Sequence, residues 1–298
     1  MIGLSDKSWL VEMMQEGKIS SLIDQAARND TSSSYDAYFG FGQTVRLADK
    51  PGVFKVSLAG LALGTLLLKV LDENELSGKI LDVGTGSGVQ AILLRSLGAT
   101  NIVGSDVCRD AVLLAAANEL LNFSDNQIQF VVADLFDGVS DTSEKFDVIV
   151  FNPPGWRTPS TYFLDELSRI SGNGEMTPTS MFYGDQILLR FLCELPGRLC
   201  QGGRAIIGMN SLVGIQDVLE RYRACYSGAS PLSFRLMERH TFPLIFYSET
   251  WKKTSSALFE EFRNWRESNR AAYAIDSQGQ IYWSYELIEC RIKKSGRC

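Results

Sequence analysis

The sequence predicts an α/β fold, in which a mostly parallel sheet carries helices on both faces. From residue 56 to about 225, short apolar runs of strand length alternate with longer stretches of helical periodicity. Strands that are separated by helices need crossover connections, and these connections bring the strands together in parallel. The chain of 298 residues, 45% of them hydrophobic and 21% charged, also has the length and composition for one large core.

The first 50 residues are expected to form a helical element and an arm ahead of the main domain. Apolar residues follow helical spacing within 5–29, and a run of asparagine, aspartate, threonine and serine ends that pattern. The glycine-rich and aromatic stretch 38–47 then predicts a strand pair or an extended arm.

Residues 51–298 are expected to form the main domain, with apolar strands bounded by glycine, aspartate or asparagine and helices between them. The predicted strands are 79–83, 102–106, 128–133, 146–151 and 204–209. The predicted helices are 57–71, 88–97, 109–122, 185–195 and 214–226. The C-terminal part, 230–298, predicts further strands in the apolar runs 233–247 and 280–292, on either side of a helix at 249–269.

Composition excludes several classes of function. Six scattered cysteines without a C-x-x-C pair, together with a single histidine, fit neither a zinc site nor a disulfide framework, so we expect no metal and reduced thiols. A net charge of −6 argues against a protein that holds long nucleic acid by charge alone. The apolar run 58–68 is too short to span a membrane, and no signal peptide is recognised. A soluble, cytoplasmic protein is the expectation.

A glycine-rich turn predicts a cofactor site. Gly84-Thr85-Gly86-Ser87-Gly88 follows an apolar strand and opens a helix, and glycine lets backbone approach a ligand closely. Asp82 lies at the carboxyl end of that strand, Asp106 ends the next strand, and Asp134 ends the third. Open α/β sheets bind ligands at this edge, and a carboxylate placed like Asp106 accepts hydrogen bonds from ribose hydroxyls. The pattern predicts a nucleoside-bearing cofactor, with Asp134 near the adenine.

Asn152-Pro153-Pro154 at the end of the fourth strand predicts a site for a nucleophilic nitrogen. Proline fixes φ and lacks a backbone donor, so the two prolines hold this turn in one shape and leave its carbonyl groups free. The side-chain oxygen of Asn152 and the carbonyl of Pro153 are then both able to accept hydrogens from one amine. Such positioning needs neither a metal nor a strong base when the leaving group is a sulfonium.

The glycine spacing alone leaves two cofactor classes open. A dinucleotide fingerprint has the spacing G-x-G-x-x-G, whereas this chain has G-x-G-x-G, and such fingerprints vary. The Asn-Pro-Pro turn favours methyl transfer from S-adenosylmethionine. A nicotinamide-dependent oxidoreductase and a non-catalytic protein that keeps the cofactor pocket remain the alternatives.

With these motifs in place, the chain resembles the class I S-adenosylmethionine-dependent methyltransferases of the Asn-Pro-Pro-aromatic group. That group includes release-factor glutamine methyltransferases and adenine and guanine N-methyltransferases. The likeness spans about 52–210 and implies a Rossmann-like, seven-stranded sheet with one antiparallel strand, into which Ile281–Ile292 would fit. It implies cofactor contacts at Asp82, Gly84, Thr85, Gly86, Gly88, Asp106, Val107, Asp134, Leu135 and Asn152, catalytic roles for Asn152 and Pro153, and substrate contacts at Pro154, Trp156 and Tyr183.

One departure from the family pattern bears on the acceptor. The fourth place of the motif, where the family usually has an aromatic ring, holds Gly155, and Trp156 follows it. The insertion 156–183, broken by proline and glycine, predicts a lid over the substrate. We therefore expect a small-molecule acceptor with an amine, amide or hydroxyl nucleophile. A protein glutamine is the second choice, and a nucleobase is the third.

Overall fold

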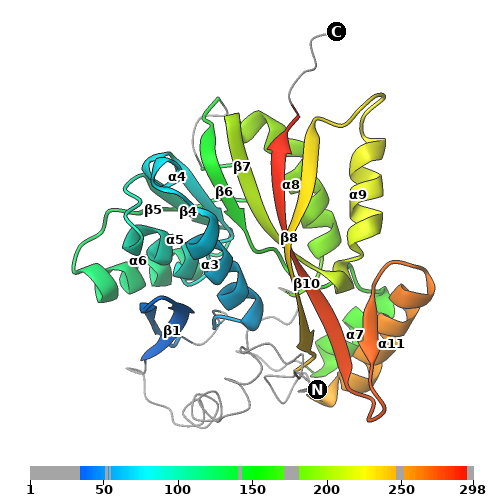
Figure 1. Ribbon diagram of the computed structural model, residues 1–298. Coiled ribbons are helices and arrows are strands. Elements are labelled where there is room, and N and C mark those ends of the chain that lie inside the picture. Colours follow the sequence, from blue (N-terminus) through cyan, green and yellow to red (C-terminus); the bar gives the residue numbers. More distant parts are fainter. Residues whose placement is uncertain are drawn as a thin grey trace, which may run out of the picture.

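The computed structural model describes residues 34–50, 53, 55–139, 143–170, 181–245 and 252–293. A twisted central sheet carries helices on both of its faces, which confirms the predicted α/β class (Figure 1). The predicted N-terminal helix within 5–29 and the central part of the predicted lid, 171–180, lie outside the described residues.

The main sheet contains a continuous path of seven strands in the order β5-β4-β3-β6-β7-β10-β8, and the short β9 pairs with β10. The strands are β3 (Ile80–Val83), β4 (Ile102–Asp106), β5 (Gln129–Val132), β6 (Phe146–Phe151), β7 (Leu199–Asn210), β8 (Leu232–Pro243), β9 (Tyr273–Ile275) and β10 (Ile281–Ile292). β3 to β7 pair in parallel, whereas β10 is antiparallel to β7 and β8. The antiparallel strand of the path is thus β10, Ile281–Ile292, as predicted.

Helices connect these strands. They are α3 (Leu58–Val70), α4 (Glu73–Ser77), α5 (Val89–Ser96), α6 (Arg109–Phe123), α7 (Thr161–Ile170), α8 (Gly184–Arg198), α9 (Ile215–Ala224) and α11 (Ser255–Glu267). The five helices predicted between residues 57 and 226 are present, and α11 lies within the predicted 249–269. The sequence predicted that this helix ends at 195, but α8 continues past Pro196 to Arg198, and Leu199 caps it by donating to the carbonyl of Leu195. The predicted strand pair near 38–47 is the hairpin β1 (Ser34–Gly40) and β2 (Gln43–Ala48).

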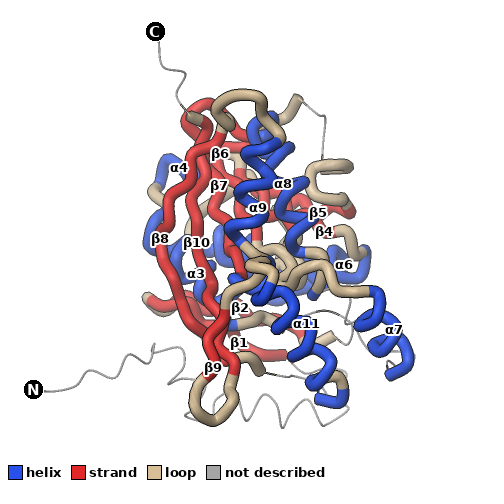
Figure 2. The backbone as a smooth tube through the Cα atoms, turned by 90° about the vertical axis from the view of Figure 1, so that its right-hand side faces the viewer, coloured by secondary structure: helices blue, strands red, loops and turns tan. Residues whose placement is uncertain are grey.

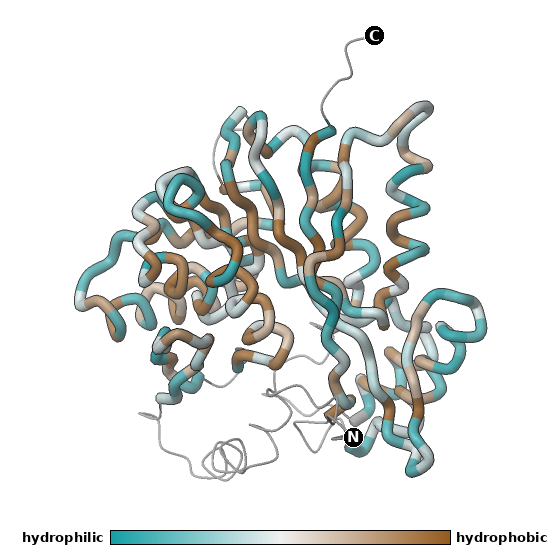
Figure 3. The backbone as a smooth tube through the Cα atoms, viewed as in Figure 1, coloured by the Kyte–Doolittle hydropathy of each residue, from teal (hydrophilic) through white to brown (hydrophobic). Residues whose placement is uncertain are grey.

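Alternating side chains of the strands divide the core into two layers. On β6, Val148 and Val150 face α3, α5 and the hairpin, whereas Ile149 and Phe151 face α8 and α9. Both layers are apolar, so the central strands read as nearly continuous hydrophobic runs (Figure 3). Figure 2 shows α8 and α9 lying together on one side of the sheet. This arrangement leaves the carboxyl ends of the parallel strands free to form a site.

A third apolar cluster lies beside that edge of the sheet. It joins α7 to α11 through buried aromatic residues, with Trp156 making edge-to-face contacts with Phe182 and Phe262 at centroid distances of 5.2 and 5.5 Å. The described part of the predicted lid is therefore packed into the fold. In the ranges given above, no helix is both long and apolar enough to cross a bilayer.

Candidate active site

A cavity of about 730 Å³ opens at the carboxyl ends of β3, β4 and β6. Its walls come from the start of α3, the glycine turn after β3, the ends of β4 and β5, the Asn-Pro-Pro turn after β6, and the ends of β7, β8 and β10. Of the residues predicted for the site, the cavity is lined by Asp82, Gly84, Thr85, Gly86, Asp106, Val107, Asp134, Leu135, Asn152, Pro153, Pro154 and Trp156. Gly88 and Tyr183 are not among its lining residues.

Glycine is required for different structural reasons at Gly86 and at Gly88. Gly84 and Gly86 have φ of +64° and +55°, and a Cβ on Gly86 would meet no atom within 4 Å. Gly86 therefore presents bare backbone to the cavity, the form in which a ligand approaches most closely. Gly88 begins α5 instead, and a Cβ there would lie 2.9 Å from the Cβ of Ala115 on α6. Its small size allows α5 and α6 to approach each other.

Asp106 is held by two backbone donors. Its carboxylate accepts from the amide of Gly86 at 2.9 Å and from the amide of Cys108 at 2.9 Å. A carboxylate has about four lone-pair sites, so two remain for hydroxyl groups of a ligand. Val107, which is 71% exposed, lies beside it at the rim of the cavity.

Asp82 lies deeper than Asp106. It is only 2% exposed and accepts a hydrogen bond from the Thr85 hydroxyl at 2.6 Å. Burial raises the pKa of the Asp82 carboxyl to about 7, and the bond from Thr85 opposes that rise only in part. A cationic ligand group in the cavity would stabilise the ionised form of this carboxyl.

The end of β5 supplies a more exposed wall. Asp134 forms an ion pair with Arg190 of α8 at 3.1 Å, with both side chains about half exposed. Leu135, which is buried and has φ of +55°, follows it along the cavity wall. The ion pair links this wall to α8.

The Asn-Pro-Pro turn after β6 lines another part of the cavity. Asn152 directly follows β6, and its side-chain oxygen accepts a hydrogen bond from the Tyr285 hydroxyl at 2.8 Å. Gly184, at the start of α8, lies so close to the turn that a Cβ on it would overlap the carbonyl of Pro154. The turn is therefore enclosed by backbone on one side and by the tyrosine on the other.

The close contact with Asn210 explains why position 155 holds a glycine. A Cβ at this position would lie 2.8 Å from the side-chain nitrogen of Asn210. Trp156 is 6% exposed, donates its backbone amide to the carbonyl of Met181 at 2.9 Å and packs into the third cluster. Tyr183 has φ of +66° and precedes α8, where it packs on the same cluster.

Sequence reasoning assigned no role to several polar residues of the cavity, among them Gln90, Asn210 and Tyr285. Gln90 donates to the carbonyl of Gly60 at 2.7 Å, and its buried side-chain oxygen has no hydrogen-bond partner among the described residues. Asn210 accepts from the amide of Leu212 at 2.9 Å. The available signals were a glutamine within an otherwise apolar helix start and an asparagine at the carboxyl end of a strand.

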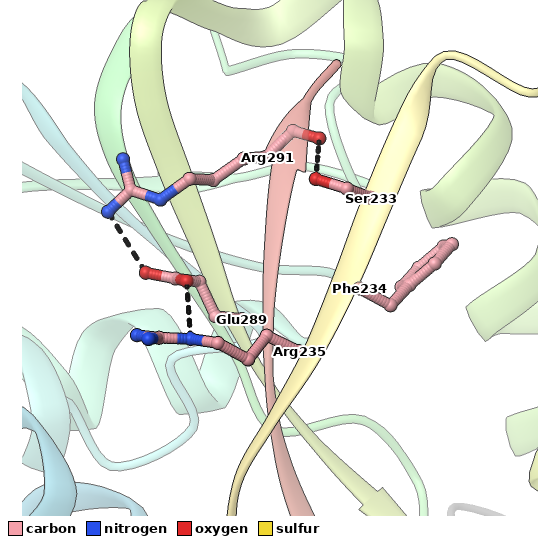
Figure 4. A pocket seen from close by; sticks show the side chains of 5 residues that line it. All are labelled: Ser233, Phe234, Arg235, Glu289 and Arg291. Atoms are coloured by element: carbon pink, nitrogen blue, oxygen red, sulfur yellow. Dashed lines mark hydrogen bonds and ion pairs between the residues drawn. The ribbon is translucent and has the colours of Figure 1, made fainter.

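A shallower hollow lies on β8 and β10, away from this cavity (Figure 4). Arg235 and Arg291 converge there on Glu289, with distances of 3.1 and 2.9 Å. Arg204 pairs with the same carboxylate at 3.1 Å. Since these charges are engaged with one another, we assign no function to this hollow.

Comparison with known proteins identifies the family. The family model described as the methyltransferase small domain matches residues 44–162. A putative protein N5-glutamine methyltransferase of Methanocaldococcus jannaschii is 34% identical over 171 residues, which cover 57% of this chain and 77% of that relative. The chain belongs to the methyltransferase small-domain family. This result favours a methyltransferase over the nicotinamide-dependent oxidoreductase that the sequence left open.

Two further comparisons extend this result. A release factor glutamine methyltransferase of Lactococcus lactis is 38% identical over 102 residues, which are 34% of this chain and 36% of that relative. The chain thus spans about a third of that relative's length. A solved structure of a putative methyltransferase in complex with SAH has a TM-score of 0.50 at 10% identity, covering 93% of this chain and 66% of the other. That likeness supports the fold alone.

The cavity fits S-adenosylmethionine, the cofactor that the sequence predicts for this methyltransferase. The backbone of Gly86 is bare, the Asp106 carboxylate has free lone pairs for the ribose, and the buried Asp82 carboxyl favours a cationic ligand. We propose that these residues, together with Asp134, hold the cofactor.

Proposed function

We propose that this methyltransferase methylates the nitrogen of a carboxamide, and that the carboxamide belongs to a glutamine side chain of a protein. The sequence alone favoured a small-molecule acceptor. The two named relatives are both glutamine methyltransferases, and this moves the preference to a protein amide. The net charge of −6 gives no support to a nucleic-acid acceptor.

The observation that carries the proposal is the hydrogen-bonding polarity around the Asn-Pro-Pro turn. A carboxamide presents N–H donors and a carbonyl acceptor in one plane. Asn152 and Pro153 offer oxygen acceptors for the N–H groups. Asn210 offers a donor, because its oxygen is engaged by the amide of Leu212 and its nitrogen then faces Gly155. Its nitrogen has no partner among the described residues, so it is available to the acceptor's carbonyl.

Bound S-adenosylmethionine supplies a methyl group on a positively charged sulfur, which leaves as a neutral thioether. Asn152 and Pro153 accept the N–H groups of the acceptor and thereby aim its lone pair at the methyl carbon. The nitrogen forms the new C–N bond and loses one proton to solvent. No general base of high pKa is needed on the protein, since positioning supplies most of the acceleration.

The proposal is tested with a recombinant peptide-chain release factor as acceptor. The full chain and tritiated S-adenosylmethionine are incubated with the factor, with variants in which each exposed glutamine is changed to glutamate, and with deproteinised small-molecule extract and purified ribosomal RNA. The expected result is label on the factor that one glutamine-to-glutamate change abolishes, because glutamate lacks the amide nitrogen. Label confined to RNA or to the small-molecule extract would contradict the proposal.

A further inference from the structure

Tyr285 of β10 reaches across β7 to the end of β6. β7 lies between the other two strands, and neighbouring strands are about 4.8 Å apart, so a side chain can cross only where β7 leaves room. Gly208 leaves that room, because a Cβ there would overlap the Tyr285 hydroxyl. Asn152 continues the alternation of Val148 and Val150, so its side chain projects to the same face of the sheet as Tyr285.

The resulting contact is a partly buried hydrogen bond. The Tyr285 hydroxyl donates to the side-chain oxygen of Asn152 at 2.8 Å, and the tyrosine is 2% exposed. Burial raises the pKa of this phenol well above its usual range, so the hydroxyl keeps its proton. The protonated hydroxyl donates its hydrogen to the Asn152 oxygen. Exchanging the oxygen and nitrogen ends of the Asn152 amide would break this bond, because the amide nitrogen cannot accept it.

We propose that Tyr285 is a positioning residue of the methyltransferase: through the space left by Gly208 it locks the Asn152 amide with its oxygen in place to receive the acceptor. Neither Tyr285 nor Gly208 belongs to the Asn-Pro-Pro motif. The inference rests on the role that the proposed function gives to Asn152. An amide oxygen has two lone pairs, so Tyr285 takes one and leaves the other for an N–H of the acceptor.

The test uses Tyr285→Phe, which keeps the ring and removes the donor. The matched control is Tyr222→Phe, since Tyr222 is fully buried in the α8–α9 layer and does not line the cavity. With an acceptor that takes up label from S-adenosylmethionine, kcat of Tyr285→Phe should fall about 10- to 100-fold. This is the scale on which misplacing a reacting group lowers the rate. The Kd for S-adenosylhomocysteine should stay the same, and Tyr222→Phe should leave kcat unchanged.

A double-mutant cycle with Asn152→Ala separates positioning from general packing. Once Asn152 is absent, Tyr285→Phe should lower kcat no further. An equal loss from Tyr285→Phe in both backgrounds would overturn the inference. If Asn152→Ala itself leaves kcat unchanged, the role that the proposed function gives to Asn152 is wrong. That outcome differs from an equal loss in both backgrounds, which would contradict only the role of Tyr285.

A second readout needs no acceptor. In the complex with S-adenosylhomocysteine, NMR signals of the Asn152 side-chain NH₂ are assigned by their loss in Asn152→Ala. In Tyr285→Phe these signals should shift and exchange faster with solvent, whereas in Tyr222→Phe they should not change. Identical Asn152 signals in the wild type and Tyr285→Phe would refute the lock, whatever the acceptor is. Gly208→Ala, which displaces the hydroxyl without removing it, should reproduce the shift.

Discussion

Two carboxyl groups of the cavity, on neighbouring strands, differ in their surroundings. Asp106 accepts hydrogen bonds from two backbone amides and keeps free lone pairs for the hydroxyl groups of a ligand. Asp82 is removed from water, and burial raises the pKa of its carboxyl to about 7. The same residue type is therefore suited to two tasks, hydroxyl recognition at Asp106 and response to a nearby cation at Asp82.

The raised pKa of Asp82 makes stability depend on pH. In the unfolded chain the carboxyl has its ordinary pKa of 3.8, whereas in the folded chain it keeps its proton up to about pH 7. The folded state is therefore most stable below about pH 4, where the carboxyl is protonated in both states, and it loses stability as pH rises to 7. Asp82→Asn removes the ionisation, so the free energy of unfolding of the wild type, relative to this variant, should fall by up to about 4 kcal/mol across that range.

The measurement for Asp82 is urea unfolding of the cofactor-free wild type and of Asp82→Asn at several values between pH 4 and pH 8. A difference in unfolding free energy that does not change with pH would show that the carboxyl ionises equally in both states.

Asp106 should control cofactor affinity. Asp106→Asn keeps the shape but removes the charge, and hydrogen bonds to charged groups contribute about 1.5–3 kcal/mol. The Kd for S-adenosylhomocysteine, measured by calorimetry, should therefore rise about 10- to 100-fold. Asp110→Asn is the matched control, because Asp110 lies on α6 outside the cavity. A similar small change in both variants would argue against a ribose contact at Asp106.

Gly155 should resist replacement by the family's aromatic residue. In Gly155→Phe the new Cβ would lie 2.8 Å from the Asn210 nitrogen, so we expect a destabilisation of about 1–3 kcal/mol from overpacking, and reduced turnover. Asn210→Gly removes the obstacle. In that background, Gly155→Phe should cost clearly less in thermal or urea unfolding. Equal costs with and without Asn210 would mean that another contact excludes the ring.

At the scale of elements, a buried ion-pair network ties the segment after the Asn-Pro-Pro turn to α8 and α9. Arg157 donates to Asp217 of α9 at 2.7 Å and to the carbonyl of Val213 at 3.1 Å. Asp185 of α8 accepts from the amide and the hydroxyl of Thr158 at 2.8 and 2.7 Å. These bonds attach the chain directly after the turn to α8 and α9, and they therefore restrict the motion of the turn.

Breaking this network should be costly. Arg157→Met removes the partner that lies 2.7 Å from Asp217 and 3.6 Å from Asp185, and it leaves Arg221, at 3.4 Å, as the remaining cation beside Asp185. Losing hydrogen bonds between charged groups in this way should cost about 1.5–3 kcal/mol. Arg169→Met provides the control, since Arg169 is 70% exposed in its pair with Glu166 and should cost less than about 1 kcal/mol. Urea unfolding of both variants measures the difference. Comparable costs would show that the network contributes little.

Elements with strong apolar periodicity could be predicted, and weak ones could not. β3, β4 and β6 are buried apolar runs that end in recognisable polar residues, and the sequence located them to within a residue. α4 has five residues and no buried side chain, so its pattern contains no core-facing stripe. The short β9 forms only because β10 offers it a partner, which is a contact that local sequence does not contain.

At the scale of the whole molecule, strand order determines which predicted residues meet. The motif after β3 and the motif after β6 are far apart in sequence, yet β3 and β6 are neighbours in the sheet. Sequence reasoning anticipated this meeting, because strand ends with polar residues share one edge. It missed Tyr285, since the place of this residue depends on β10 pairing with β7 and on the glycine that lets the tyrosine cross. It also overlooked Asn210, although this residue directly follows the predicted strand 204–209.

A crystal structure of the full chain with S-adenosylhomocysteine would test the proposed site most directly. We predict that the ribose hydroxyls bind Asp106 and that the sulfur faces Asn152 and Pro153, with the Tyr285 hydroxyl still bonded to the asparagine. A sulfur that faces away from the Asn-Pro-Pro turn would contradict this prediction, because no nitrogen held by Asn152 and Pro153 could then reach the methyl group.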